Sequence, residues 1–365
     1  MKTPNVLANA SASLNVDLSA IIGNYQTLSS QSSSADCAAV VKANAYGLGM
    51  EQVASAIYNN TDCKIFFVAN LLEAISLRKI LPEAIIYVFN GLFEDQIDTY
   101  TEYNIRPILN NIDQIALWDG RTEPCAIHFD TGINRLGLNE LDTENFLSGA
   151  NDLNLTLILS HLVRSEEPDH PTNKIQLEKF NKIRSALPHI PASLANSGGI
   201  YLGDEYHFDL LRPGIMLYGG NPGLKKLSDG IKNTIEIKAK ILQIRNLEPG
   251  MSVGYNAQWT AERPSRIAIL NVGYADGTYK TNDNAQNVYL DGSLVPVIGK
   301  VSMDMIATDI TGPQFDHIKV EDEAELIGPN ITLEMVCELS TLGQYELLTG
   351  IGQRYNKNYT LGARA

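Results

Sequence analysis

One lysine stands at a position where its amine could act as a reactive group. Lys42 follows the apolar residues 38–41, which are typical of a buried strand, and precedes Gly47, Gly49 and a helical pattern over residues 50–58. Lysine is rarely buried without a partner. This side chain is therefore either a charge that reaches water from the end of a strand or an amine in a dry pocket, where desolvation would lower its pKa. The position alone favours the first interpretation.

Other reactive groups follow later apolar runs of the same kind. Each has an ordinary explanation by itself: a core histidine, a surface ion pair or a plain turn. Barrel enzymes carry their chemistry at the carboxyl ends of the strands, so the recurrence of such groups at the same point of successive runs predicts one shared site. These groups are Arg135, His161, the turn Ser197-Gly198-Gly199, and Arg212 with Gly214 and Ile215.

The elements that would position these groups are eight short apolar runs. Segments with helical periodicity, such as residues 71–80, 93–103 and 172–186, separate most of them, and strands that alternate with helices indicate a parallel sheet. Eight such units predict an α/β fold, a closed (β/α)8 barrel of the TIM type, with a doubly wound open sheet as the alternative. The seventh connection, residues 198–207, is short and rich in tyrosine. The runs are residues 38–42, 65–70, 85–90, 105–110, 125–130, 156–161, 192–196 and 208–212.

After about residue 235 the pattern changes to β-rich runs broken by turn signals. A chain of 365 residues is long enough for two domains. We therefore predict a barrel over residues 14–235, a mostly β C-terminal domain over 236–365, and an N-terminal arm, residues 1–13, that associates with the C-terminal domain. The expected β runs are residues 235–244, 266–272, 287–290, 294–298 and 304–310, followed by a helix at 332–342.

Composition limits the possible partners. The chain has 42 acidic and 28 basic residues and a net charge of −14, which argues against binding nucleic acid or an anionic membrane. No apolar run is long enough to span a bilayer, and the four cysteines lack CxxC or metal-ligand spacing. The acidic and histidine residues between His161 and His170 also match no ligand pattern. We expect a cytoplasmic protein with free thiols and no metal.

The glycine-containing turns suggest a phosphate site. Ser197-Gly198-Gly199 and Gly214-Ile215 can present a hydroxyl and backbone N–H groups to a phosphate, whereas the chain has no GxxxxGK or GxGxxG motif for a nucleotide. A phosphate next to a carbonyl that a lysine can reach suggests pyridoxal phosphate, bound to Lys42 as a Schiff base. Arg212 is the best candidate to face the pyridine nitrogen, and it would disfavour protonation of the ring.

These motifs together resemble the alanine racemase family, in an ordered match over roughly residues 14–350. The resemblance agrees with the barrel and β domain expected from the apolar runs. The matching motifs are VVKANAYGLG at 40–49, DTGxxRLG at 130–137, Asn196-Ser197, RPGIMLYG at 212–219, VGY at 253–255, VGYADG at 272–277 and GKVSMD at 299–304.

The resemblance implies a racemase with two catalytic bases. Lys42 would hold pyridoxal phosphate as an internal aldimine and act on the D-alanine face of the substrate. Tyr255, from the β domain of a second subunit, would act on the L-alanine face, so the active site would be shared in a homodimer. Arg212 would lie against the pyridine nitrogen, and His161 would bridge Arg212 toward Tyr255.

The resemblance also implies the binding groups. Arg135 would contact the phenolic oxygen of the cofactor and the substrate carboxylate. Met303 would orient that carboxylate through its backbone N–H, with support from Asp304. The cofactor phosphate would be bound by Tyr46, Ser197, Gly214 and Ile215.

Two positions depart from the family pattern. Many members have a lysine, often carbamylated, where this chain has His128, so the usual support of Arg135 must come from another group. Some members carry a tyrosine near the C-terminus that narrows the mouth of the site, and this chain offers Gln353 or Tyr355 there.

The expected function is that of an isomerase that interconverts L- and D-alanine and supplies D-alanine for cell-wall peptidoglycan. Three alternatives remain: a racemase with broader specificity that also accepts serine, a decarboxylase of related fold, and a carrier of pyridoxal phosphate without catalysis. Decarboxylases of that kind normally place a carboxylate at the pyridine nitrogen, which Arg212 opposes. The expected β domain with Tyr255 argues against a carrier built on the barrel alone.

Overall fold

The computed structural model describes residues 12–224, 230–278, 286–340 and 342–362. Residues 21–232 form one compact unit, and the segments on either side of them form another. Helix α1, Leu18–Ser29, begins in the second of these and continues into the first. We call the two the barrel unit and the β unit and describe each separately.

In the described part of the barrel unit, seven strands form one parallel sheet in chain order. The ring is completed by β2, Asp36–Cys37, which pairs in parallel with β10, Leu210–Leu211, while an Asn196–Arg212 bridge lies between β9 and β10. The predicted barrel is therefore confirmed. The seven strands are β3 Ala39–Val40, β4 Ile65–Val68, β5 Ile85–Val88, β6 Arg106–Leu109, β7 Cys125–His128, β8 Leu155–Leu159 and β9 Ala192–Ser193.

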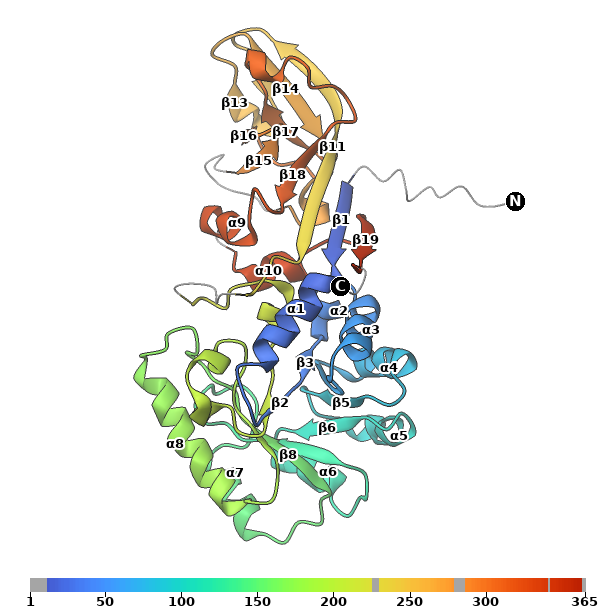
Figure 1. Ribbon diagram of the computed structural model, residues 1–365, viewed down its shortest axis with the longest axis vertical. Coiled ribbons are helices and arrows are strands. Elements are labelled where there is room, and N and C mark those ends of the chain that lie inside the picture. The colour runs from blue at the N-terminus through green and yellow to red at the C-terminus, as the bar shows by residue number, and fades with distance from the viewer. Residues whose placement is uncertain (1–11, 225–229, 279–285, 341, 363–365) are drawn as a thin grey trace, which may run out of the picture. The chain divides into compact units, whose positions relative to one another are not determined.

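Helices cover the outside of this ring of strands, as Figure 1 shows for α3 to α8. Asn70, Asn111 and Asn139 each accept a hydrogen bond from a backbone N–H in the first turn of a helix, and such caps fix where helices begin. The helices are α2 Lys42–Tyr46, α3 Met50–Asn60, α4 Leu71–Ile80, α5 Ile97–Glu102, α6 Ile112–Trp118, α7 Glu140–Ser148 and α8 Pro171–Ala186.

The seventh connection contains two short 3-10 helices, η3 Gly199–Tyr201 and η4 Asp204–Tyr206. Gly203, between them, has φ +128°, a conformation that an α-helix does not continue through. The short, tyrosine-rich connection therefore passes from β9 to β10 without the α-helix that the other units suggest.

The β unit contains an eight-stranded sheet in the order β14-β17-β16-β15-β18-β11-β1-β19, and β11 also pairs with β14. Six of these strands therefore form a closed ring, which agrees with the predicted mostly β domain. The 13-residue β11 pairs with β1, β18 and β14, and its pairing with β14 has a register shift at Ile241–Gln243, where a bulge bends the strand. The strands are β1 Ala12–Asp17, β11 Ile235–Leu247, β14 Ser265–Leu270, β15 Asn287–Leu290, β16 Ser293–Ile298, β17 Ile306–Asp309, β18 Glu323–Ile327 and β19 Asn356–Thr360.

Smaller elements complete the β unit. β12 Ser252–Val253 and β13 Trp259–Thr260 form a short hairpin, and two helices follow β18, α9 Leu333–Leu339 and α10 Gln344–Thr349. All four cysteines of the chain are unpaired. Among the described residues, no helix has both the length and the apolar character that a bilayer crossing requires.

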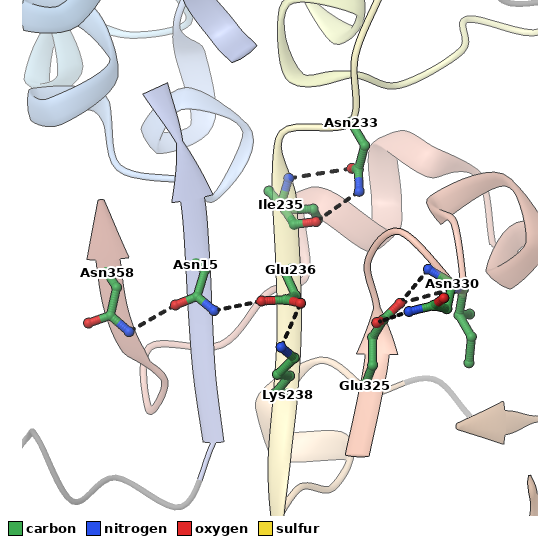
Figure 2. Close-up of polar contacts among 9 residues, drawn as sticks. Asn15, Asn233, Ile235, Glu236, Lys238, Glu325, Asn330 and Asn358 are labelled. Carbon is green, nitrogen blue, oxygen red and sulfur yellow. Dashed lines mark hydrogen bonds and ion pairs between the residues drawn. The ribbon is translucent and has the colours of Figure 1, made fainter. Parts of the chain in front are cut away.

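β1 lies between two strands from distant parts of the chain, antiparallel to β11 and parallel to β19. Figure 2 shows a polar row across them: Asn15 donates to Glu236 at 2.9 Å and accepts from Asn358 at 2.9 Å. This strand includes residues 14–17, which we expected in the barrel domain, and it contacts the β unit instead. Most of the expected arm, residues 1–11, lies outside the described residues.

Candidate functional site

The barrel unit contains a cavity of about 260 Å³ at the carboxyl ends of its strands. Such a volume is close to that of small-molecule pockets, and this end of a barrel is where such enzymes carry their chemistry. Three predicted site residues line it: Lys42 after β3, Arg135 after β7 and His161 after β8. The lining consists of Lys42, Ala69, Phe89, Asn90, His128, Arg135, Leu136, Leu159 and His161.

The Lys42 amine lies in this cavity, 5.5 Å from the centroid of the Phe89 ring. Burial lowers the pKa of Lys42, the positive charge of Arg135 lowers it further, and Glu73 acts in the opposite direction. A lysine with a lowered pKa has a larger fraction of neutral amine at physiological pH and is a better nucleophile. The structure therefore favours the dry-pocket interpretation of Lys42 over the strand-end charge.

The element α2 is not a regular α-helix: after Lys42 its residues form a left-handed turn. Ala43, Asn44, Ala45 and Tyr46 all have φ between 52° and 54°, a conformation that costs about 1–2 kcal/mol for each residue other than glycine. The turn directs Tyr46 to pack on Tyr218, with ring centroids 4.7 Å apart. Strain of this kind persists only where neighbouring contacts hold it.

Tyr46 and three other predicted residues meet at what we call the phosphate corner: Tyr46, Ser197, Gly214 and Ile215. The Ser197 hydroxyl accepts the Gly214 N–H at 2.9 Å. A Cβ atom on Gly214 would lie only 2.5 Å from the Tyr46 hydroxyl, so this close approach requires glycine. Ile215 opens the 3-10 helix η5, Ile215–Tyr218, whose first N–H groups lack partners within the helix. Hydroxyls and backbone N–H groups gathered in this way suit a phosphate.

Arg212 is buried in the barrel unit. Its guanidinium donates to the Ser193 hydroxyl and to the Ser160 carbonyl oxygen. Burial lowers the pKa of Arg212 to about 9, which leaves the group charged at neutral pH. Burial and then the charges of Arg212 and Arg135 lower the pKa of His161 well below its usual value, so this imidazole is neutral.

His128 is neutral as well. Burial, followed by the charge of Arg212, lowers the pKa of His128 to about 4. The Asn110 amide nitrogen donates to the Phe89 and Ile108 carbonyls, so the Asn110 oxygen must accept from His128 Nδ1, 3.0 Å away. His128 Nε2 is therefore a buried acceptor, and it has no partner among the described protein atoms.

Tyr255, Met303 and Asp304 belong to the β unit. The side chain of Tyr255, the first residue of the 3-10 helix η6 Tyr255–Ala257, is 67% exposed, and that of Met303 is 53% exposed. Gly254 and Gly299 let their two loops pack closely, since a Cβ on Gly299 would lie 2.8 Å from the Val253 carbonyl oxygen. The β unit thus presents the tyrosine and the methionine on neighbouring loops.

Asp304 is tied to the C-terminal part of the β unit. Arg354 donates to Asp304 Oδ1 at 2.6 Å and binds both carboxylate oxygens of Asp276 at 2.7 and 2.8 Å. Asp276 in turn accepts from the Gly273 N–H. Arg354 therefore joins the Met303-Asp304 loop to the turn at Gly273, a connection that the sequence analysis did not include.

Two further residues of the barrel unit were missed. Asn110, which orients His128, ends an expected strand in the same way as the other site residues, and this position could have identified it. Glu73, which faces the turn after Lys42, follows the N-cap Asn70 by three residues, the spacing of an ordinary helix cap. Nothing in that pattern indicates a contact with the turn after Lys42.

Comparison with known proteins identifies the family. The family model for the alanine racemase N-terminal domain matches residues 16–222, and the model for the C-terminal domain matches residues 234–359. The chain belongs to the alanine racemase family. Similar members include the alanine racemases of Rickettsia canadensis, 42% identical over 95% of this chain and 98% of the relative, and Methylobacterium nodulans, 38% identical over 96% of this chain and 97% of the relative.

Solved alanine racemases have the same fold. The Bartonella henselae enzyme, described with covalently bound pyridoxal phosphate, has a TM-score of 0.90 and 36% identity, over 96% of this chain and all of the other. The biosynthetic enzyme of Pseudomonas aeruginosa has a TM-score of 0.87 and 31% identity over the same shares. The resemblance on which the sequence analysis relied is therefore confirmed.

The positions that depart from the family pattern differ in their surroundings. Tyr355 is buried in the β unit, where it lines a small cavity of about 30 Å³, whereas Gln353 is exposed. Of the two candidates for the mouth of the site, only Gln353 is therefore free of the core. At the other departure, a neutral His128 offers a hydrogen-bond acceptor and no charge.

Proposed function

We propose that this alanine racemase family member interconverts L- and D-alanine, with pyridoxal phosphate held covalently by Lys42. The observation that carries the proposal is the Lys42 amine, whose pKa is lowered in a cavity of about 260 Å³. The covalently bound cofactor of the Bartonella henselae relative supports it.

The residues around the cavity fit this cofactor. Pyridoxal phosphate supplies an aldehyde for a lysine amine and an electron sink for the charge left when the α-proton departs. Tyr46, Ser197, Gly214 and Ile215 would bind its phosphate, and Arg135 its phenolic oxygen. Arg212 would face the pyridine nitrogen and, as a buried cation, would disfavour protonation there.

Two groups would move the α-proton on opposite faces of the substrate. Lys42 would exchange it on the D-alanine face and Tyr255 of a second copy on the L-alanine face, so that the working molecule is a homodimer. His161, held neutral, would link Arg212 to Tyr255. Arg135 and the Met303 N–H, with Asp304 behind it, would hold the substrate carboxylate. The D-alanine formed would serve peptidoglycan synthesis.

The test is isotope exchange at the α-carbon. L-Alanine is incubated with the protein in heavy water. The products are separated on a chiral column, and their masses are measured by mass spectrometry. With the wild type we expect D-alanine that carries deuterium and no carbon dioxide. With Lys42→Ala we expect no isomerisation and loss of the visible absorbance of the lysine-bound cofactor. Deuterated alanine without isomerisation, or release of carbon dioxide, would contradict the proposal. Replacing alanine by serine tests substrate breadth.

A further inference from the structure

The left-handed turn after Lys42 is held by a carboxylate from another element. Glu73, in the first turn of α4, accepts the Ala43 N–H through Oε1 at 2.6 Å and the Ala69 N–H through Oε2 at 2.8 Å. Ala43 is the first left-handed residue of the turn, and Ala69 directly follows β4. One carboxylate therefore joins the segments that leave two adjacent strands, because β3 and β4 are paired.

Backbone hydrogen bonds also hold the turn: the Ala45 N–H donates to the Val41 carbonyl at 2.8 Å and the Gly47 N–H to the Ala43 carbonyl at 2.9 Å. Asn44 accepts the Met50 N–H through its side chain at 2.8 Å, which closes the far end of the turn. At the near end, the Ala43 N–H follows directly after Lys42, and Ala43 has only a methyl side chain. A left-handed conformation is unfavourable for alanine and tyrosine, so the carboxylate supplies an anchor that the local sequence lacks.

The turn positions two groups of the site, Lys42 and Tyr46. Its first residue follows the backbone of Lys42, and its last left-handed residue is Tyr46, whose hydroxyl lies at Gly214. A change in the turn would therefore move the amine and one wall of the phosphate corner together.

We propose that Glu73 is a positioning residue for Lys42 and Tyr46, acting through its two hydrogen bonds to the Ala43 and Ala69 N–H groups. The inference rests on the proposed function, since that function is what makes the position of Lys42 important. The two hydrogen bonds of Glu73, however, join residues of this chain and do not depend on that function. Glu73 is also the nearby negative charge that opposes the lowering of the Lys42 pKa, which provides a readout that simple loss of stability would not change.

The test measures the ionisation of Lys42 directly. The full-length protein, freed of cofactor, is labelled at a series of pH values with a small amine-reactive reagent, and the label on the Lys42 peptide is compared by mass spectrometry with that on exposed Lys64. Glu73→Ala removes the charge and both acceptors; loss of the charge lowers the Lys42 pKa, but relaxation of the turn lets water reach the amine, so we expect this variant to titrate at higher pH than Glu73→Gln. Glu73→Gln keeps one acceptor but loses the charge, so the titration moves to lower pH.

A matched control is Glu325→Gln in the β unit. Glu325 is a buried carboxylate that accepts the Asn330 N–H, as Figure 2 shows, and also the Ile331 N–H. We expect this variant to lose stability and leave the Lys42 titration at its original pH. The holoprotein of each variant is also passed through a desalting column to measure retained pyridoxal phosphate, and we expect retention to fall in the order wild type, Glu73→Gln, Glu73→Ala.

The outcomes separate the two proposals. If both Glu73 variants titrate as the wild type does, or if both move equally to lower pH, Glu73 does not position the turn. If the Lys42 titration moved to higher pH in both variants, the positioning role would be supported, and the glutamine would have failed to keep the hydrogen bond to the turn. If Lys42 shifts as expected but no variant, nor the wild type, binds pyridoxal phosphate, the positioning role stands and the proposed function fails.

Discussion

At Gly214 the backbone approaches a side chain of the phosphate corner so closely that even one carbon atom does not fit. A methyl group there would lie 2.5 Å from the Tyr46 hydroxyl and 3.7 Å from Val40 Cβ. Overpacking of this kind costs about 1–3 kcal/mol, which corresponds to roughly a tenfold loss or more in an equilibrium constant.

We therefore expect Gly214→Ala to weaken pyridoxal phosphate binding by roughly tenfold or more, as measured by equilibrium dialysis. Gly23→Ala is the matched control because a Cβ at Gly23, within α1, meets nothing within 4 Å. That substitution should leave binding unchanged. Equal affinity in Gly214→Ala and the wild type would show that the close approach does not matter for the cofactor.

His128 makes the protein sensitive to acid. The pKa of His128 is lowered from 6.5 to about 4 by burial and the charge of Arg212. Between these pH values the unfolded chain binds a proton that the folded protein does not, so the free energy of unfolding falls as the pH falls. From pH 7 to pH 5 this group alone accounts for a loss of about 2 kcal/mol.

His128→Gln removes this titration while leaving that of His161 in place. The urea midpoints of the wild type and the variant are measured at pH 7 and pH 5. We expect the wild type to lose about 2 kcal/mol more than the variant between the two pH values. The same loss in both proteins would mean that the folded state protonates His128 at its ordinary pKa.

At the scale of elements, one serine joins the last two strands of the barrel. Ser193 in β9 is buried, donates to the Leu210 carbonyl in β10, and accepts from the Arg212 guanidinium. β9 and β10 have two residues each, so a side-chain contact carries more of their association than it would in long strands.

Ser193→Ala leaves a carbonyl oxygen and a buried guanidinium with one partner fewer, which costs about 1–3 kcal/mol. We expect the melting temperature to fall by several degrees in differential scanning calorimetry. Ser185→Ala provides the comparison, because the Ser185 hydroxyl donates to the Asn181 carbonyl on the exposed face of α8, and its change should be within about 0.5 kcal/mol. Equal melting temperatures for the two variants would contradict this account.

The strands of the barrel were predictable from the sequence, and the turn after Lys42 was not. Parallel strands buried on both faces give continuous apolar runs, and residues that follow such runs share one end of a barrel, so Lys42, Arg135 and His161 could be placed together. The left-handed turn at Ala43–Tyr46 contains no glycine to announce it, and its anchor, Glu73, is 30 residues away.

Some strand pairings in the β unit also could not be predicted from local sequence patterns. The runs that became β11, β14, β15, β16 and β17 were expected from their own residues. β1 and β19 were not: β1 is short, with only Leu14 and Val16 buried, β19 is mostly polar, and their pairing with each other joins the two ends of the chain. Asn15 and Glu236, which face each other, are 221 residues apart.

At the scale of the whole molecule, the proposed site draws on both units of the chain. Lys42 belongs to the barrel unit and Tyr255 to the β unit. In a symmetric dimer that shares its sites, each site would combine the lysine of one copy with the tyrosine of the other.

We expect Lys42→Ala and Tyr255→Phe chains to be inactive alone and active when mixed. Random exchange gives half heterodimers with one intact site each, so the mixture should reach about a quarter of wild-type racemisation. A mixture of Lys42→Ala with Arg135→Ala, both altered in the barrel unit, should recover nothing. Failure of the first mixture, with heterodimers verified by affinity tags, would mean that the two bases do not come from different subunits.

The position of β1 has a consequence for how the protein is made. Of the described strands it is the first to leave the ribosome, but its partners β11 and β19 follow only after the whole barrel unit has been translated. The barrel can fold while β1 still exposes both edges, and open strand edges invite pairing with other chains. The nascent chain is therefore most prone to misassembly while residues 18–234 are being synthesised, and the second edge of β1 is covered only when β19 emerges.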